Sequence, residues 1–123
     1  MNAEQIQTIT IVGAGDMGHG IAEICALAGL QVHLYDIKQA FVDRGLQRIQ
    51  QSLDKQASKQ KLDAQAAKDA AGRIQLFTDL PKAVKNTDFM IEAAPEILNV
   101  KTDIFRQADA NAPAHAILAS NTS

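Results

Sequence analysis

Short apolar runs alternate along this chain with longer stretches of helical periodicity. The runs predict strands at 9–12, 32–35, 74–77, 89–91 and 116–119. Apolar residues at helical spacing predict helices at 16–27, 81–84 and 100–110. Gly29 follows the first of these helices, at the position where a left-handed residue commonly ends a helix. Because the strands are apolar throughout and alternate with helices, we expect an α/β fold with a doubly wound parallel sheet, covered on both faces.

A different pattern separates the second predicted strand from the third. From residue 38 onward, apolar side chains recur every three or four positions among Gln, Lys, Arg and Asp, which predicts a long amphipathic helix. The alanine-rich segment 62–71 predicts a second helix, folded back on the first near 59–61. A helical hairpin is therefore expected between the second and third strands. The 123 residues leave room for one domain, 1–123.

Composition and charge narrow the possible partners. The net charge of -2 supplies no strong field for nucleic acid or an anionic membrane, so neither partner is expected. No apolar run approaches the roughly 20 residues that cross a bilayer, and no signal peptide opens the chain, so we expect a cytoplasmic protein. The single Cys25 excludes an internal disulfide and is expected to be a small buried apolar residue. Metal-ligand spacing is missing from the three scattered histidines, His19, His33 and His115, so no metal site is expected.

The sequence GAGDMG at 13–18 fits the pattern G-x-G-x-x-G between a predicted strand and a predicted helix. In a dinucleotide-binding turn, Gly13 allows the tight bend, Gly15 lets the backbone approach a pyrophosphate, and Gly18 allows close packing of helix on strand. Exposed amides at the helix start, around Asp16 and Met17, then attract the phosphates. The alternative is a glycine turn that serves only a close-packed junction.

Asp36 ends the second predicted strand, eighteen residues after Gly18. A carboxylate at this position accepts hydrogen bonds from the adenosine ribose hydroxyls, which indicates NAD. The same charge would repel the 2′-phosphate of NADP, and no arginine directly follows Asp36, although Lys38 is a weak exception. The alternative is a solvated residue that caps the next helix, and both roles can coexist. FAD proteins of this fold usually carry Glu at the position of Asp36.

Other polar residues carry weaker signals when they are considered singly. Glu92 and Glu96 follow the fourth predicted strand, at the sheet edge where open α/β folds bind ligands, although ordinary solvation is the default expectation for both. Ser52 and Lys59 are seven residues apart, which places them on one helix face about 10 Å apart. Alone, this spacing indicates only a solvated helix face.

Three segments together resemble the amino-terminal, NAD-binding part of 3-hydroxyacyl-CoA dehydrogenases, a family that includes 3-hydroxybutyryl-CoA dehydrogenases. The first segment is the glycine motif with its flanks, IVGAGDMGHGIA at 11–22. The second, MIEAAPE at 90–96 followed by Lys101 and Phe105, is similar to the family's I-E-A-x-x-E stretch. The third, ILASNTS at 117–123, is similar to its strand ending in S-N-T-S. The resemblance spans nearly the whole chain and includes the helical hairpin.

The resemblance implies a role for each matching residue. Asp36 would hold the adenosine ribose, and Ser52 and Lys59 would face the coenzyme A part of an acyl-CoA substrate. Ser123 would donate a hydrogen bond to the reacting oxygen of the substrate. The nicotinamide end of the cofactor would lie along Glu96, Lys101 and Asn121.

The family reaction, in fatty acid metabolism, oxidises the 3-hydroxyl of an acyl-CoA to a ketone and passes hydride from C3 to NAD. A histidine, oriented by a glutamate, removes the hydroxyl proton. In the family both residues follow the S-N-T-S segment, so we expect this chain to be truncated after its fifth strand and inactive alone. The helical domain that follows in the family, and the homodimer interface it supplies, would also be absent. Two alternatives are a free-standing NAD-binding or NAD-sensing module and an oxidoreductase acting on a small hydroxy acid.

Overall fold

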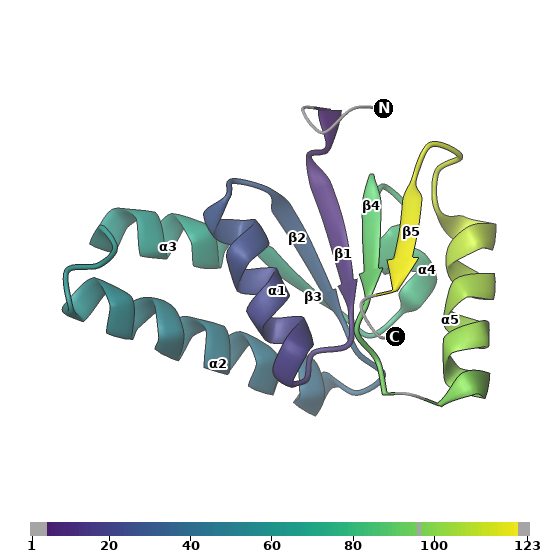
Figure 1. Ribbon diagram of the computed structural model, residues 1–123, viewed down its shortest axis with the longest axis horizontal. Helices are drawn as coiled ribbons and strands as arrows, with labels where there is room; N and C mark the ends of the chain where they lie inside the picture. Colours follow the sequence, from purple (N-terminus) through teal and green to yellow (C-terminus); the bar gives the residue numbers. More distant parts are fainter. Residues whose placement is uncertain (1–4, 96, 121–123) are drawn as a thin grey trace.

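The computed structural model describes residues 5–95 and 97–120 (Figure 1). Within these residues, five parallel strands form one sheet in the order β3-β2-β1-β4-β5. The strands are β1 (Thr8–Val12), β2 (Gln31–Tyr35), β3 (Ile74–Phe77), β4 (Phe89–Glu92) and β5 (Ile117–Ser120). The strand order reverses direction between β1 and β4, so the carboxyl ends of these two central strands open onto the crevice where doubly wound sheets bind ligands.

The helices are α1 (Asp16–Leu27), α2 (Gln39–Ser58), α3 (Ala64–Gly72), α4 (Leu80–Val84) and α5 (Leu98–Asn111). The predicted α/β class, the doubly wound sheet and the hairpin between the second and third strands are all confirmed. Three boundaries differ from the prediction in ways that affect the site. The fourth strand includes Glu92, the fifth ends at Ser120, and α2 ends just before Lys59.

Alternate residues of each central strand face opposite layers, which gives two cores. Ile9 and Ile11 of β1 pack with α1, α2 and α3 in the larger core. Val12 faces the other layer, where it packs with α4 and α5. Figure 1 shows the hairpin α2 and α3 extending from the sheet beside α1, with α5 at the opposite edge. Helices therefore lie on both faces of the sheet, and within the described residues β5 remains partly exposed, with Ile117 44% exposed.

Local sequence explains where several helices begin and end. Gly29 has a φ of 97°, which confirms the left-handed residue predicted after α1. Asp63 and Asp79 are the N-caps of α3 and α4, and their carboxylates accept hydrogen bonds from the Ala66 and Lys82 amides at 3.2 and 3.1 Å. No helix in the described part of the chain is both long and apolar enough to span a membrane.

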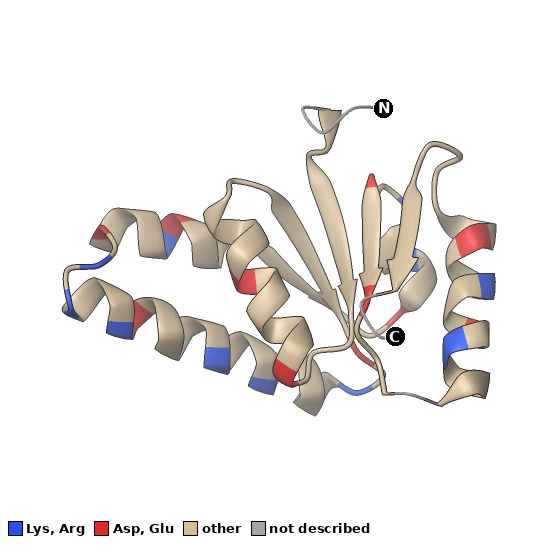
Figure 2. Cartoon of the chain, viewed as in Figure 1, with Lys and Arg blue, Asp and Glu red and all other residues tan. Residues whose placement is uncertain are grey.

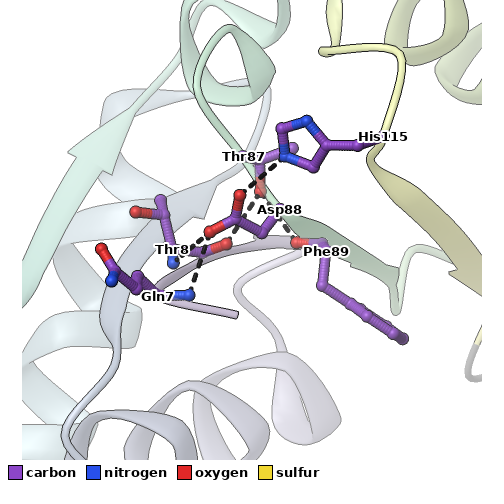
Figure 3. Close-up of polar contacts among 6 residues, drawn as sticks. All are labelled: Gln7, Thr8, Thr87, Asp88, Phe89 and His115. Atoms are coloured by element: carbon purple, nitrogen blue, oxygen red, sulfur yellow. Dashed lines mark hydrogen bonds and ion pairs between the residues drawn. The ribbon is translucent and has the colours of Figure 1, made fainter. Parts of the chain in front are cut away.

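A carboxylate clamp ties the strands together at the amino edge of the sheet (Figure 3). Asp88 accepts hydrogen bonds from the backbone amides of Gln7 and Thr8 at 2.9 and 3.1 Å, and its other oxygen lies 2.8 Å from His115 Nε2. The hydrogen bond from Gln7 is the main cause that lowers the pKa of Asp88 below its ordinary value of 3.8. This clamp lies at the opposite end of β4 from the candidate ligand site.

Candidate functional site

The glycine turn connects β1 to α1 at the carboxyl edge of the sheet. Gly13 has a φ of 112°, and a Cβ there would lie 2.8 Å from the carbonyl oxygen of Ala93. A Cβ on Gly18 would lie 1.6 Å from the carbonyl oxygen of Gly13. A Cβ on Gly15, by contrast, would meet nothing within 4 Å. The fold itself therefore requires Gly13 and Gly18, whereas Gly15 keeps open the space in front of the first turn of α1.

Asp36 directly follows β2 and points toward this turn. One carboxylate oxygen accepts a hydrogen bond from the Ala14 amide at 2.9 Å, and the other accepts one from the Ile37 amide at 2.7 Å. The interpretation of Asp36 as a helix cap is wrong, because α2 begins with Lys38 as its N-cap and has no side-chain cap. Asp36 instead connects the end of β2 to the glycine turn, and these hydrogen bonds position its carboxylate in the wall of the site.

A cavity of about 600 Å³ runs along this edge of the sheet. Its walls are mostly apolar and come from the glycine turn, the segment after β2, and the segment between β4 and α5. They are formed by Gly13, Gly15, Asp16, Met17, Asp36, Ile37, Phe41, Ala93, Ala94, Pro95, Ile97 and Val100. The cavity thus extends from Asp36, across the open face of the glycine turn, to the start of α5, which suits an elongated ligand with a polar centre and apolar ends.

A second cavity of about 340 Å³ adjoins the first and shares Gly15, Asp16, Asp36 and Phe41 with it. Its remaining walls include two arginines of α2, Arg44 and Arg48. Arg48 forms an ion pair of 2.8 Å with Asp16 at the start of α1. Neither arginine directly follows Asp36 in the sequence, so the sequence alone did not indicate them, and α2 brings both back beside the turn. Their helical spacing of four residues was the available signal.

The carboxyl ends of β4 and β5 hold a buried polar group. The default expectation that Glu92 is solvated is wrong, because its side chain is 0% exposed. Its Oε2 accepts a hydrogen bond from the Ala94 amide at 2.5 Å, and its Oε1 accepts one from Ser120 Oγ at 2.8 Å. Lys101 Nζ of α5 lies 3.9 Å from the same Oε1, and its side chain is only 17% exposed. A single carboxylate therefore connects β4, β5, α5 and the wall of the larger cavity.

The two hairpin residues implied for coenzyme A lie apart from both cavities. Ser52 is half-buried, and its hydroxyl donates a hydrogen bond of 2.9 Å to Glu23 of α1, which also accepts one from Gln56. Lys59 is exposed and follows the last residue of α2. Figure 2 shows other basic residues along α2. The role of Ser52 and Lys59 toward coenzyme A stays a prediction.

Three residues implied by the resemblance, Glu96, Asn121 and Ser123, lie outside the described residues. None of the three histidines lies beside Glu92. The ring of His19 bonds the carbonyl oxygen of Gly15 at 2.7 Å, and the ring of His33 bonds that of Ala83 at 2.9 Å. His115 belongs to the clamp at the amino edge. Among the described residues, no group of three or more His, Cys, Asp or Glu could hold a metal ion.

Two further side chains, Tyr35 and Cys25, have pKa values above the ordinary ones. Burial is the main cause that raises the pKa of Tyr35 at the end of β2, and the neighbouring charge of Asp36 adds to it. Burial also raises the pKa of Cys25, which is half-buried against the larger core rather than fully enclosed. The raised pKa values mean that both groups stay neutral to a higher pH than an ordinary tyrosine or cysteine does.

Comparison with known proteins gives this arrangement a context. Residues 8–123 match the family described as 3-hydroxyacyl-CoA dehydrogenase, NAD binding domain. The chain is 39% identical to a probable 3-hydroxybutyryl-CoA dehydrogenase of Bacillus subtilis, over 97% of this chain and 41% of that protein. It is 37% identical to the 3-hydroxyadipyl-CoA dehydrogenase of Escherichia coli, over 96% of this chain and 25% of that protein.

Solved structures agree with these matches. The (S)-3-hydroxybutyryl-CoA dehydrogenase of Ralstonia eutropha superposes with a TM-score of 0.90 at 41% identity, over 97% of this chain and 42% of that chain. The chain therefore spans less than half the length of these relatives. The resemblance predicted from the three sequence segments is confirmed.

Proposed function

This chain belongs to the family of NAD-binding domains of 3-hydroxyacyl-CoA dehydrogenases, and from that premise we propose that residues 1–123 are the cofactor-binding part of such an enzyme. The complete enzyme would oxidise a 3-hydroxyacyl-CoA to a 3-ketoacyl-CoA by hydride transfer to NAD. One observation carries the proposal. Gly15, which has open space where a side chain would lie, and the carboxylate of Asp36 both line one elongated cavity.

The cavity and its residues fit NAD well. The first turn of α1 begins at Asp16 with Gly15 as an N-cap that has no side chain, so its amides can meet a pyrophosphate at the positive end of the helix. Asp36 would accept hydrogen bonds from the adenosine ribose, between the exposed apolar side chains of Ile37 and Phe41. We assign the pyrophosphate to the turn formed by Gly13, Gly15, Asp16, Met17 and Gly18.

The resemblance supplies the roles at the far end of the cofactor. Lys101 is proposed to lie along the nicotinamide, together with Glu96 and Asn121. Ser123 is proposed to donate a hydrogen bond to the reacting oxygen of the substrate, and Ser52 and Lys59 to face coenzyme A. Their support is the match of each residue to the family's motifs.

We propose that the 123 residues alone bind NAD but do not turn over substrate. The support is the position of the three histidines, because none lies near the end of β4 and β5 where hydride transfer is proposed. General acid-base catalysis by a placed base contributes about 10² to 10⁴ in rate. His19, beside Gly15 at the pyrophosphate end, is a poor substitute base.

Calorimetric titration with NAD and NADP, followed by an assay for NADH formation from 3-hydroxybutyryl-CoA, tests the proposal. We expect saturable binding of NAD, weaker binding of NADP and no turnover. The preparation must be free of host dehydrogenases. Turnover that co-purifies with the chain and disappears in His19→Ala would show that the catalytic centre is misplaced, and equal affinity for the two cofactors would contradict the role of Asp36.

A second titration separates an enzyme part from a free-standing NAD-binding module. An enzyme part should bind 3-hydroxybutyryl-CoA in the presence of NAD and lose affinity in Lys59→Ala. A module with no substrate should bind NAD alone.

A further inference from the structure

The buried carboxylate of Glu92 is a charged group of the site region to which the proposed function gives no role. Burying a charge is costly unless it is paired and hydrogen-bonded. Among the described residues, the partners of Glu92 include the Ala94 amide, Ser120 Oγ and Lys101 Nζ, which come from three segments. Such a group can serve the fold alone, the cofactor alone, or both.

Its place in the sheet relates it to one end of the cofactor. Val12, Glu92 and Ser120 pair in register at the carboxyl ends of β1, β4 and β5. Asp36 follows β2, on the other side of β1, so Glu92 lies two strand spacings away, or roughly 10 Å. A dinucleotide with its adenosine at Asp36 and its pyrophosphate at the turn after β1 therefore extends toward β4, with its nicotinamide nearest the Glu92 group.

The contacts of Glu92 also shape the wall of the larger cavity. The Ala94 amide that donates to Glu92 belongs to the segment that lines this cavity, and Ala93 of the same segment is packed against Gly13. Lys101 follows Val100, which lines the cavity near the start of α5. Glu92 thus fixes the Ala93–Ala94 part of the cavity wall and holds the nearly buried ammonium group of Lys101 beside it.

Resting on the proposed function, we infer that Glu92 and Lys101 set the relative affinity of the site for oxidised and reduced cofactor, with Glu92 acting as a positioning residue for Lys101. The nicotinamide ring carries a positive charge in NAD⁺ and none in NADH. A carboxylate near the ring favours the cationic form and an ammonium group disfavours it. Because Lys101 Nζ lies 3.9 Å from Glu92 Oε1, the removal of either charge changes the net field at that end of the cavity.

Two substitutions test this inference through the ratio of the NAD⁺ and NADH dissociation constants, and a third serves as a control. Glu92→Gln makes the site more positive, so binding of NAD⁺ should weaken relative to that of NADH by roughly tenfold, the order expected for unit charges about 10 Å apart at an effective dielectric constant of about 20. Lys101→Met makes it more negative, so the ratio should move in the opposite direction. Calorimetry for NAD⁺ and NADH fluorescence for the reduced form supply the constants.

Asp88→Asn is the matched control, because Asp88 is the carboxylate at the other end of the same strand. It also replaces a carboxylate with an amide and weakens a hydrogen-bonded clamp, yet it lies at the amino edge, away from both cavities. We expect Asp88→Asn to lower stability and leave the ratio unchanged. A purely structural role for Glu92 predicts that Glu92→Gln behaves the same way.

The outcomes separate this inference from the proposed function beneath it. If the unaltered chain binds neither cofactor, the proposed function fails. If the chain binds both cofactors and the ratio does not move in Glu92→Gln, or moves in the same direction in Lys101→Met, only the inference fails. If Glu92→Gln does not fold, Lys101→Met tests the inference alone, because the Lys101 ammonium group is not fully buried and its loss should be tolerated by the fold. An unchanged ratio in Lys101→Met then overturns the inference.

Discussion

Replacing Asp36 with alanine should have two separable effects, one on the chain alone and one on its complex with NAD. The carboxylate accepts hydrogen bonds from the Ala14 amide at 2.9 Å and from the Ile37 amide at 2.7 Å. Both bonds exist without a ligand and contribute to the free energy of unfolding. The bonds proposed to the ribose hydroxyls contribute only to binding.

The structure sets the size of each effect. A hydrogen bond to a charged group contributes about 1.5 to 3 kcal/mol, and less where the freed donor can regain water. Because Ile37 is exposed, its amide can regain a hydrogen bond to water, and the loss of the bond from Ala14 dominates. We therefore expect Asp36→Ala to lower the free energy of unfolding by about 2 kcal/mol. Loss of the ribose bonds should weaken NAD binding by about 1.5 to 3 kcal/mol, which is roughly 10- to 150-fold in Kd.

Urea unfolding without cofactor measures the first effect, and calorimetric titration with NAD measures the second. Asp63→Ala is the matched control, because it also removes a carboxylate that accepts a backbone amide, at the N-cap of α3. It should cost about 1 kcal/mol of stability and leave NAD affinity unchanged. An NAD affinity that falls by less than about 0.5 kcal/mol in Asp36→Ala, when the unaltered chain binds NAD, would refute the ribose role.

Two further predictions concern the clamp and the glycine turn. Asp88→Asn should lower stability by about 1 to 2 kcal/mol near neutral pH, since Gln7 and Thr8 donate to one carboxylate oxygen and a neutral amide oxygen accepts these hydrogen bonds more weakly. The folded-state pKa of Asp88 is lowered, so this stability is present above its ordinary value of 3.8 and is lost as the pH falls through the folded-state value. Urea unfolding at neutral and strongly acid pH should show the gap between the two proteins closing in acid, and a constant gap would contradict it. Gly15→Ala should change stability by less than about 0.5 kcal/mol but weaken NAD binding, because its methyl group enters open space in the cavity wall. Gly18→Ala should destabilise the fold by about 3 kcal/mol, because its methyl group meets the carbonyl oxygen of Gly13, and thermal unfolding that ranks the two variants the other way would refute this account of the turn.

The parts of the fold that depend on neighbouring residues in sequence could be predicted. Helix α1 begins and ends where its apolar spacing and Gly29 indicate, and the long apolar stripe of α2 identified the hairpin. The turn at 13–18 could be located for the same reason, because its glycines lie between a strand and a helix.

The contacts that depend on the packing of distant segments could not be predicted. Asp16 and Arg48 come together only because α2 folds back beside α1. Glu92 is buried because β5 and α5, which both follow it in the chain, pack around its side chain. One local signal was available, since Glu92 is two residues after Met90 in the same strand and so shares its buried face.

The central claim is that NAD occupies the carboxyl edge of this sheet, with its adenosine at Asp36 and its pyrophosphate at the glycine turn. Titration of the isotope-labelled chain with NAD, followed by amide NMR shifts, tests this claim most directly. We predict saturable shifts of the Gly13, Gly15, Ile37 and Ala94 amides, while the amides of the Asp88 clamp stay in place. Shifts confined to the amino edge, or no saturable shift at all, would contradict the account.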